Sequence, residues 1–542
     1  MNQSPPFRDT NFFEADRPLR DAVARSGTPP RQVAELSAFG AAWGSGEVAD
    51  LGRQANENPP RLRTVDPRGE RLDDVEFHPA YHDLMTRSMA AGLHASGWDA
   101  AASTPGHGRP AASGQALRAA RFYMACQAEA GHLCPLTMTH ASVAALSAAP
   151  ETLSRWLPRI VGRRYDGALR PWWEKDAVTL GMGMTERQGG TDVRANVTAA
   201  LPAGDHYRVS GQKWFMSAPM CDAFLILAQA PGGLTCFLVP RFEPDGRVNG
   251  LRLQRLKDKL GNRSNASSEA VFEMAYAERV GDEGQGVRTI IGMVQLTRLD
   301  CAVASAGLMR MGLAHAVHHA RHRTAFQRRL IDQPLMRTVL ADMALEVEAA
   351  TALAMRLARA LDAAPTDPAE AALARLAIPA AKYLICKQAP DLLQEAMECL
   401  GGNGYVEEFP LARAYREAPV NAIWEGSGNV MALDVLRAAA RSPDAVAAVL
   451  EALGRQAGEV GPPMVDAIVS DLRAPEAERR ARRITEAIAR LAAMASLTEG
   501  DPDVADAYAA RLRAGTEFAA STWGASGPPD HADALLARVL PA

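Results

Sequence analysis

The chain has few cysteines, very few lysines and no long uninterrupted hydrophobic run. Its seven cysteines are scattered and never spaced C-x-x-C, which argues against a disulfide framework or a zinc ribbon. The longest uncharged run, residues 223–240, is interrupted by Pro231, Gly232 and Gly233, so it predicts two strands and a turn rather than a membrane span. The N-terminus also lacks the basic and apolar segments of a signal peptide. We therefore expect a soluble, cytoplasmic protein with reduced thiols and no membrane partner.

The composition is otherwise that of an ordinary globular protein. Only six of the 59 basic residues are lysine, and the formal net charge of −4 does not indicate a polyanionic partner for the chain as a whole. The apolar fraction is 47% and the charged fraction 23%, which excludes a collagenous, low-complexity or wholly disordered chain. A length of 542 residues is typical of three or four domains.

Two common nucleotide-binding motifs are missing. There is no G-x-G-x-x-G between a strand and a helix, and no G-x-x-x-x-G-K-[ST], so we expect neither a Rossmann fold nor a P-loop. Glycines cluster instead within residues 181–192, 401–404 and 424–429. A single glycine pair is typical of a turn, but the dense first cluster would let backbone N–H groups approach a flat or phosphorylated ligand.

The local pattern changes three times along the chain, which predicts four domains. Residues 1–180 and 281–440 alternate turns with stretches in which apolar residues recur every three or four positions, as in amphipathic helices. Residues 181–280 hold short β-rich runs between Gly, Pro, Asn and Asp, which predicts a compact β-barrel-like domain. A further helical domain is expected over residues 441–542, with an N-cap at Ser442. The predicted fold class is α+β.

Four ordered motifs resemble those of the acyl-CoA dehydrogenase family. Residues 184–192, M-T-E-R-Q-G-G-T-D, resemble the signature M-T-E-x-x-x-G-S-D, and residues 212–217, Q-K-W-F-M-S, resemble the strand Q-K-x-W-I-T. Residues 400–405, L-G-G-N-G-Y, and 423–427, I-W-E-G-S, match the segments L-G-G-x-G-[FY] and I-Y-E-G-T. The resemblance covers roughly residues 80–438. The N-terminal extension and the helical tail narrow it to the AidB-type adaptive-response flavoproteins, an isovaleryl-CoA dehydrogenase-like branch.

This resemblance implies the acyl-CoA dehydrogenase fold, with a helical N-terminal domain, a middle β domain, a helical bundle and an extra C-terminal helical domain. It also implies a non-covalent FAD and an oxidoreductase that acts on the CH–CH group of an acyl-CoA. The cofactor residues implied by the motif positions are Met182, Met184, Thr185, Gly190, Thr191, Phe215, Met216, Ser217, Arg323, Ile423, Ser427 and Asn429. In the family, the Thr185 position lies at the pyrimidine side of the flavin, Phe215 against the ring and Ser217 near N5.

The catalytic residue implied by the resemblance is Glu425. Dehydrogenation of an acyl thioester needs a carboxylate to take the α-proton, and a dry pocket suits that base because burial raises a carboxylate's pKa. A glutamate taken at random here would be a solvated helix-start residue, but Glu425 occupies the family's Y-E-G-T position. Some members place the base near position 297, where this chain has Thr297. The neighbouring Arg298 is expected to contact the substrate.

Arg323 is expected to serve a second subunit. It begins R-T-A-F, which resembles the R-x-x-F element that reaches a neighbouring subunit's FAD, and a bidentate guanidinium suits a pyrophosphate. That sharing implies a homotetramer. Two positions depart from the family: Glu398 stands where many members have Gln, and the usual glutamine after R-x-x-F is replaced at residues 333–334. Contacts to the neighbouring FAD are expected to differ there.

A histidine run is the main competing signal. His315, His318, His319 and His322 lie near one helix face, and two imidazoles one turn apart can ligate zinc. The glutamate of H-E-x-x-H is absent, however, and no Cys, Asp or Glu cluster is adjacent. We therefore expect no metal site, because helix-face histidines near an oligomer interface are the commoner case.

The tail is the candidate for binding double-stranded DNA, which the resemblance implies. Residues 441–542 hold eleven arginines against fifteen acidic residues, whereas surfaces that follow phosphates are normally basic. A charge run on a helix is also commonly just a solvated face. The arginines expected to contact DNA are Arg479, Arg480, Arg482, Arg483 and Arg490.

Two functions therefore remain open from the sequence. The first is an FAD-dependent acyl-CoA dehydrogenase-like flavoprotein linked to the response to DNA alkylation, with Glu425 as its base. The second is a DNA-binding protective flavoprotein in which dehydrogenase activity is vestigial.

Overall fold

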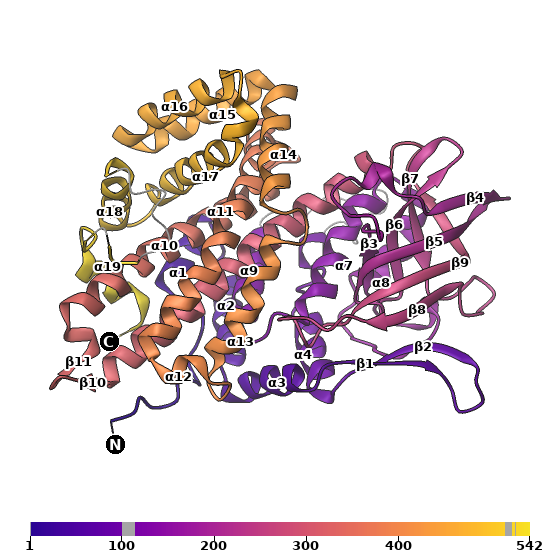
Figure 1. The fold of residues 1–542 in the computed structure, drawn as a ribbon, viewed down its shortest axis with the longest axis horizontal. Coiled ribbons are helices and arrows are strands. Elements are labelled where there is room, and N and C mark those ends of the chain that lie inside the picture. The colour runs from indigo at the N-terminus through magenta and orange to yellow at the C-terminus, as the bar shows by residue number, and fades with distance from the viewer. Residues whose placement is uncertain (1, 100–113, 515–522, 526, 542) are drawn as a thin grey trace. The chain divides into compact units, whose positions relative to one another are not determined.

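The computed structural model describes residues 2–99, 114–514, 523–525 and 527–541 (Figure 1). Backbone contacts divide the chain into two compact units. Unit 1 comprises residues 1–49, 115–128 and 298–542, and unit 2 comprises residues 50–114 and 129–297.

Unit 1 is built almost entirely from helices. Its N-terminal helices are α1 (Arg17–Arg25), α2 (Pro30–Trp43) and α6 (Gly114–Ala128). Its longest helices are α9 (Gly286–His322), which begins in unit 2, α10 (Pro334–Ala363) and α11 (Pro368–Leu400), with the short hairpin β10 (Thr324–Ala325) and β11 (Arg328–Arg329) after α9. The remaining helices are α12 (Gly402–Tyr405), α13 (Pro410–Glu417), α14 (Gly428–Arg441), α15 (Pro443–Gln456), α16 (Gly461–Arg473), η7 (Ala477–Arg480), α17 (Ala481–Leu497), α18 (Pro502–Arg513) and α19 (Ala532–Val539).

Several helix starts follow from an aspartate placed just before a proline-containing first turn. Asp367 caps α11 by accepting from the backbone N–H of Ala369 at 2.9 Å, with proline as the first helical residue. Asp501 caps α18 in the same way, and Asp16 accepts from Leu19 at the start of α1. Such caps satisfy N–H groups that have no partner inside the helix, and proline lacks the N–H that would otherwise be unpaired. Ser442 precedes α15, but its hydroxyl caps no N–H there.

The core of unit 1 lies along α10 and α11. Nearly every residue of α10 from Leu340 to Ala360 is buried, and α11 is buried through most of its middle. A helix that is apolar on all sides has neighbours on all sides. The neighbours of α10 and α11 include α17, which belongs to the C-terminal segment, so that segment packs directly on the bundle of unit 1.

Unit 2 combines a few helices with the strands. Its helices include α4 (Pro79–Ala90), α7 (Leu133–Leu146) and α8 (Pro150–Ile160), and α3 (Gly46–Glu57) begins in unit 1 and ends here. A hairpin, β1 (Arg61–Val65) and β2 (Arg71–Glu76), interrupts the segment predicted to be helical over residues 1–180. The turn chemistry of Asp66, which accepts two backbone N–H groups, closes this hairpin and was not recognised in the sequence.

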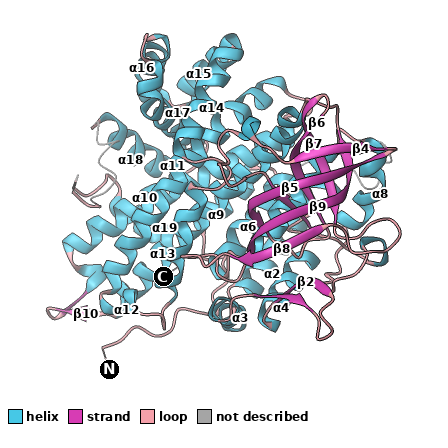
Figure 2. Ribbon diagram, turned by 45° about the vertical axis from the view of Figure 1, so that its right-hand side comes forward, coloured by secondary structure: helices cyan, strands magenta, loops and turns pink. Residues whose placement is uncertain are grey.

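The β domain of unit 2 is a sheet whose pairings close on themselves (Figure 2). Its strands are β3 (Leu180–Gly183), β4 (Ala199–Ala203), β5 (His206–Ser217), β6 (Ala223–Ala230), β7 (Gly233–Pro240), β8 (Leu251–Leu256) and β9 (Ser267–Val280). The order β6-β4-β5-β9-β7 returns to β6 through the antiparallel β6–β7 pair, while β3 pairs with β6 and β8 with β9. Closure removes the open edges of the ring, as in a barrel.

The predicted turn within residues 223–240 is confirmed. Strands β6 and β7 pair from Ala223 with Pro240 to Ala230 with Gly233, and Gly233 has a φ of +110°. Residues 206–217 form one long strand, β5, which bulges against β9. In the part of the chain that the structure describes, no helix is long and apolar enough to cross a membrane.

Two glycines of α9 allow a test of its packing in unit 1. A Cβ on Gly307 would collide with Cys126 Sγ and lie 2.5 Å from the carbonyl oxygen of Tyr123, both on α6, so Gly307→Ala should lower the free energy of unfolding by about 2 kcal/mol. Gly292→Ala is the matched control, because its Cβ would meet nothing closer than 3.6 Å, and it should be neutral or stabilise by up to about 1 kcal/mol through helix propensity. Urea unfolding measures both, and equal effects would contradict the close α6–α9 contact.

Candidate functional site

In unit 2, the structure brings the 184–192 loop against strand β5. The loop leaves β3 and pairs back through a bridge between Thr185 and Phe215, with the Trp214 N–H donating to the Thr185 carbonyl at 2.9 Å. Asn196 Nδ2 also donates to the Met184 carbonyl at 3.0 Å. Two motifs that are about thirty residues apart in sequence, M-T-E and K-W-F-M-S, therefore lie side by side.

Phe215 is the clearest candidate for contact with a flat ligand. Its ring is 51% exposed, although it lies within a strand of a mostly buried sheet. The Lys257 ammonium lies 4.6 Å from the centroid of that ring and 3.7 Å from the centroid of Trp214. Ser217, two residues along β5, places its hydroxyl 3.3 Å from that of Ser267. An exposed aromatic face beside hydroxyl and ammonium groups fits a flavin ring with polar edges.

Met216 lies on the opposite face of β5 from Phe215. Its side chain is fully buried, and its carbonyl accepts from the Ser268 hydroxyl at 3.1 Å. Strand alternation turns the Met216 side chain into the sheet interior, so only its backbone is left for the expected cofactor contact, which stays a prediction. Its neighbours in the strand keep the exposed positions.

A buried ion pair anchors the loop, and neither partner was singled out in the sequence. Glu186 Oε1 lies 2.8 Å from Lys213 Nζ, and both side chains are completely buried. Glu186 also accepts from the backbone N–H of Val197 at 2.8 Å, and Lys213 donates to the Leu227 carbonyl at 2.9 Å. Burial alone would raise the pKa of Glu186, but the hydrogen bonds from Lys213 and Thr198 and from the Val197 N–H lower it to about 2. Opposite charges inside the two adjacent motifs were the available signal.

The glycine of this loop lets a hydroxyl sit close to the backbone. A Cβ on Gly190 would collide with Thr185 Oγ1, so any larger residue would displace the predicted pyrimidine-side hydroxyl. Gly189 has a φ of +145°, which an L-residue adopts at a cost. Thr191 follows in an exposed position, and Met182 and Met184 are half-buried.

In unit 1, Glu425 lies in a turn held by two cations. Its φ is +58°, a left-handed conformation that costs energy in a residue other than glycine. Arg298 Nε donates to the Glu425 carbonyl at 3.1 Å, and Lys382 Nζ donates to the next carbonyl, that of Gly426, at 2.6 Å. The surrounding structure therefore fixes the strained backbone that carries the predicted base.

Arg298 supports the Glu425 turn from a buried position. It is 5% exposed, and its Nη1 forms a 2.8 Å ion pair with Asp434, which also receives two hydrogen bonds from Arg375. Burial lowers the pKa of Arg298, while the charges of Asp434 and Glu425 oppose that shift. A buried guanidinium needs a paired carboxylate, which Asp434 supplies, and the expected substrate contact by Arg298 stays a prediction.

The turn continues into the N-terminus of α14. Ile423 is 67% exposed, and Ser427 and Asn429 are exposed as well. Ser427 takes the N-cap position, but its side chain makes no capping hydrogen bond, so the first N–H groups of α14 are not capped by it. Uncapped N–H groups at a helix start suit a phosphate. Asn429 Oδ1 accepts from Arg482 Nε at 2.8 Å.

The tail arginines divide into one buried and four exposed residues. Arg490 is 2% exposed and pairs with Glu486 and Glu346, so its predicted contact with DNA is wrong: the α10 carboxylate draws it into the interior. The other four lie in η7 and at the start of α17. Arg479 pairs with Glu476, and Asp471 pairs with both Arg480, at 2.8 Å, and Arg483.

The histidine run and Arg323 lie at the C-terminal end of α9 and its hairpin. Within the described ranges, no three His, Cys, Asp or Glu side chains form a group that could hold a metal ion. His318 and His319 instead contact the N-terminal segment.

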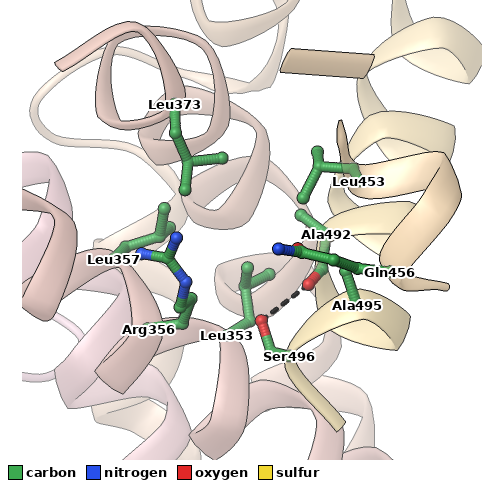
Figure 3. Close-up of a pocket in the computed structure, with 9 residues that line it drawn as sticks. All are labelled: Leu353, Arg356, Leu357, Leu373, Leu453, Gln456, Ala492, Ala495 and Ser496. Atoms are coloured by element: carbon green, nitrogen blue, oxygen red, sulfur yellow. Dashed lines mark hydrogen bonds between the residues drawn. The ribbon is translucent and has the colours of Figure 1, made fainter. Parts of the chain in front are cut away.

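A small gap in unit 1 contains none of the predicted residues. It is too narrow to hold a water molecule and lies between α10, α11, α15 and α17, lined by four leucines together with Arg356, Gln456, Ala492, Ala495 and Ser496 (Figure 3). Ser496 donates to its own helix at Ala492, and Arg356 pairs with Glu370. The gap is therefore a packing defect between helices rather than a reaction site.

Comparison with known proteins matches three domain families along the chain. The adaptive response protein AidB N-terminal domain matches residues 2–167, the acyl-CoA dehydrogenase middle domain matches residues 181–275, and the acyl-CoA dehydrogenase C-terminal domain matches residues 284–440.

Individual relatives agree with these matches. The chain is 49% identical over 440 residues to "Putative acyl-CoA dehydrogenase AidB" of Escherichia coli (strain K12). The aligned region covers 81% of this chain and 79% of that protein. It is 33% identical to acyl-CoA dehydrogenase family member 11 of Caenorhabditis elegans, over 80% of this chain and 70% of that one. The crystal structure of C. elegans ACDH-11 in complex with C11-CoA superimposes with a TM-score of 0.83 at 28% identity, covering 97% of each chain. The α+β fold and the family resemblance are thereby confirmed, and the chain belongs to the AidB branch of the acyl-CoA dehydrogenase family, whose members are FAD-binding oxidoreductases that act on CH–CH groups.

Proposed function

We propose that this protein is an acyl-CoA α,β-dehydrogenase of the AidB type in which Glu425 takes the α-proton of the substrate. The observation that carries the proposal is the turn at residues 425–426, where Arg298 and Lys382 hold two consecutive carbonyls while Glu425 keeps a left-handed backbone. Strain that is held by its surroundings is common at reacting residues, because it fixes the direction of a side chain before substrate binds.

The cofactor side of the proposal rests on unit 2 and on the start of α14. Bound FAD supplies the acceptor for the β-hydride. Phe215, Thr185 and Ser217 form the aromatic face and the hydroxyl groups for its ring, and the buried Glu186–Lys213 pair holds the loop that carries them. Ser427 and Asn429 are the proposed contacts for the pyrophosphate end, with Arg323 serving a neighbouring subunit.

The proposed substrate class is an acyl-CoA. The C. elegans relative, at 28% identity over nearly the whole chain, is a complex with C11-CoA, and the family chemistry requires an acyl thioester whose α-proton is acidified by the carbonyl. Self-association into a homotetramer is supported by large apolar side chains at the surface of unit 1, since Phe326 is 93% exposed and Leu335 and Tyr405 are also exposed.

A second function, DNA binding in a response to alkylation damage, is supported by the arginines at the start of α17. Arg479, Arg480, Arg482 and Arg483 are all exposed within five consecutive positions, and three of them also pair with carboxylates. A phosphate that binds these arginines must displace the carboxylate of each ion pair or share the arginine with it. We therefore expect weak, salt-sensitive binding that does not depend on base sequence.

Glu425→Gln tests the proposed base. The substitution keeps the shape but removes the proton acceptor, so flavin reduction by an acyl-CoA should slow by at least about a thousandfold while FAD stays bound. Anaerobic stopped-flow bleaching of the flavin absorbance measures the rate. Glu408→Gln, at an exposed glutamate, is the matched control and should reduce normally. Unchanged reduction in the Glu425 variant would place the base elsewhere.

The Glu186–Lys213 pair can be tested by stability and by pH. Lys213→Met should lower the free energy of unfolding by about 3–5 kcal/mol, because it leaves a buried carboxylate unpaired. Adding Glu186→Gln should restore part of that lost stability. Since the folded pKa of Glu186 is about 2, below its ordinary 4.5, its stabilisation is complete above about pH 4.5 and declines as the pH falls toward 2. The double variant should lack this part of the wild-type acid dependence in urea melts. No rescue by the second substitution would show that the pair does not couple.

The DNA function predicts a specific salt dependence. With Arg490 buried, four arginines remain, so the slope of log K against log salt should be about −3.6 per engaged tail, and replacing all four by Gln should flatten it. Arg455→Gln, on the exposed face of α15, is the control. Gel shifts on duplexes of unrelated sequence measure both. Absence of a shift at low salt would remove this function while leaving the dehydrogenase proposal untouched.

A further inference from the structure

Residues 2–7 form an arm along the end of unit 1 where α9 turns into the β10–β11 hairpin (Figure 1). Asn2 pairs with Thr324 through both ends of its amide: Nδ2 donates to the Thr324 carbonyl at 2.6 Å, and Oδ1 accepts from the Thr324 N–H at 2.9 Å. The Asn2 side chain thereby imitates a neighbouring strand. The arm belongs to neither a helix nor a strand, so these contacts are what hold it.

The arm touches two of the segments on which the family resemblance rests, and one of them holds Arg323, which the proposed function assigns to the cofactor. Arg323 Nη1 donates to the backbone carbonyl of Asn2, and Asn403 Nδ2, in the glycine cluster 401–404, donates to Gln3 Oε1 at 3.1 Å. Two consecutive residues of the arm thus bind the R-x-x-F element and the L-G-G-x-G element. Those elements are about eighty residues apart in sequence.

The histidine run supplies the surface on which the arm lies. Ser4 Oγ is 3.0 Å from His319 Nδ1, and His318 Nε2 donates to the Pro5 carbonyl at 2.9 Å. The Phe7 ring packs on two imidazoles, with centroid distances of 5.0 Å to His315 and 4.7 Å to His318. The unusual face of α9, first considered as a metal site, therefore has an occupant within the same chain.

We propose that residues 2–7 are a positioning arm that holds Arg323 in the orientation in which it binds the diphosphate-bearing half of a neighbouring subunit's FAD, while Asn403 holds the arm from the L-G-G-x-G segment. The inference rests on the proposed flavin function. A carbonyl on Nη1 fixes the plane of the guanidinium and occupies one of its five N–H donors, so the other donors stay available for phosphate oxygens. Fixing a long side chain in advance removes an ordering cost that binding would otherwise carry.

Protonation of the histidines should release the arm. Burial lowers the pKa of His315 to about 3, and it also lowers the pKa values of His318 and His319. The charged or titratable groups that face these three imidazoles are His322, Arg321, Arg323 and Arg413, together with the imidazoles themselves. The hydrogen bond from His318 to the Pro5 carbonyl opposes that shift. The Phe7 ring, however, covers the imidazoles of His315 and His318, so we expect docking to be strongest above about pH 6.5 and to weaken as the pH falls.

The test compares the full-length protein with the double variant Asn2→Ala/Gln3→Ala. Loss of three side-chain hydrogen bonds should weaken FAD binding to the apoprotein by about tenfold, measured by flavin fluorescence titration. Binding of ADP alone should weaken by the same factor, while riboflavin should bind as before, since the arm acts at the phosphate end. Arg31→Ala, at an exposed arginine of α2, is the matched control and should leave all three ligands unaffected.

The pH profile separates positioning from a general effect on folding. Wild-type affinity for ADP should fall as the pH drops from 7 to 5.5, although simple charge attraction to protonated histidines would raise it, and the double variant should lose that dependence. Equal affinities of wild type and variant, tighter binding by the variant, or an equal loss for riboflavin would each overturn the arm's role. If the wild-type protein binds no FAD at all, the proposed flavin function fails first, which is a different outcome.

Discussion

A charged side chain that leaves water must be paired, and both segments that carry the proposed chemistry are held by this constraint. In unit 2, the buried Glu186–Lys213 pair joins the M-T-E loop to strand β5. In unit 1, Asp434 neutralises Arg298, which in turn binds the backbone of the Glu425 turn. Each pair determines where a segment with solvent-accessible functional groups can lie.

Two of the few lysines satisfy the same constraint. Lys213 and Lys382 are almost fully buried, and each donates to a backbone carbonyl, that of Leu227 or of Gly426. A compact ammonium can reach a carbonyl through a narrow space, whereas the guanidinium is broad and planar and needs several acceptors. Arginine accordingly appears where a carboxylate offers two oxygens, as Asp434 does to Arg375.

Sequence patterns predicted the elements well and their distant partners poorly. The order of helical and β segments, the β6–β7 turn and the family were confirmed because they depend on local periodicity and on motifs within a few residues. The prediction that Arg490 contacts DNA was wrong because its partner Glu346 is on α10, more than a hundred residues away. A local run of charges does not reveal that Arg490 is buried against it. The histidines of α9 show the same limit of sequence patterns. Their spacing predicted that they share a helix face, but not that residues 2–7 cover that face. The left-handed φ of Glu425 also had no sequence signal, since non-glycine residues rarely adopt it.

The bond between Arg482 and Asn429 connects the two proposed functions. Arg482 belongs to the arginine cluster proposed for DNA, whereas Asn429 belongs to the turn proposed for the cofactor, and both lie in unit 1. A phosphate that engages Arg482 through Nε must replace this bond, so DNA binding at Arg482 would change the surroundings of Asn429, the proposed cofactor contact. Coupling of this kind is reciprocal: if DNA loosens the turn at Asn429, bound FAD must oppose DNA binding by the same free energy. The tail is therefore not an independent appendage, because one of its exposed arginines already binds a residue of the turn that is proposed to contact the cofactor.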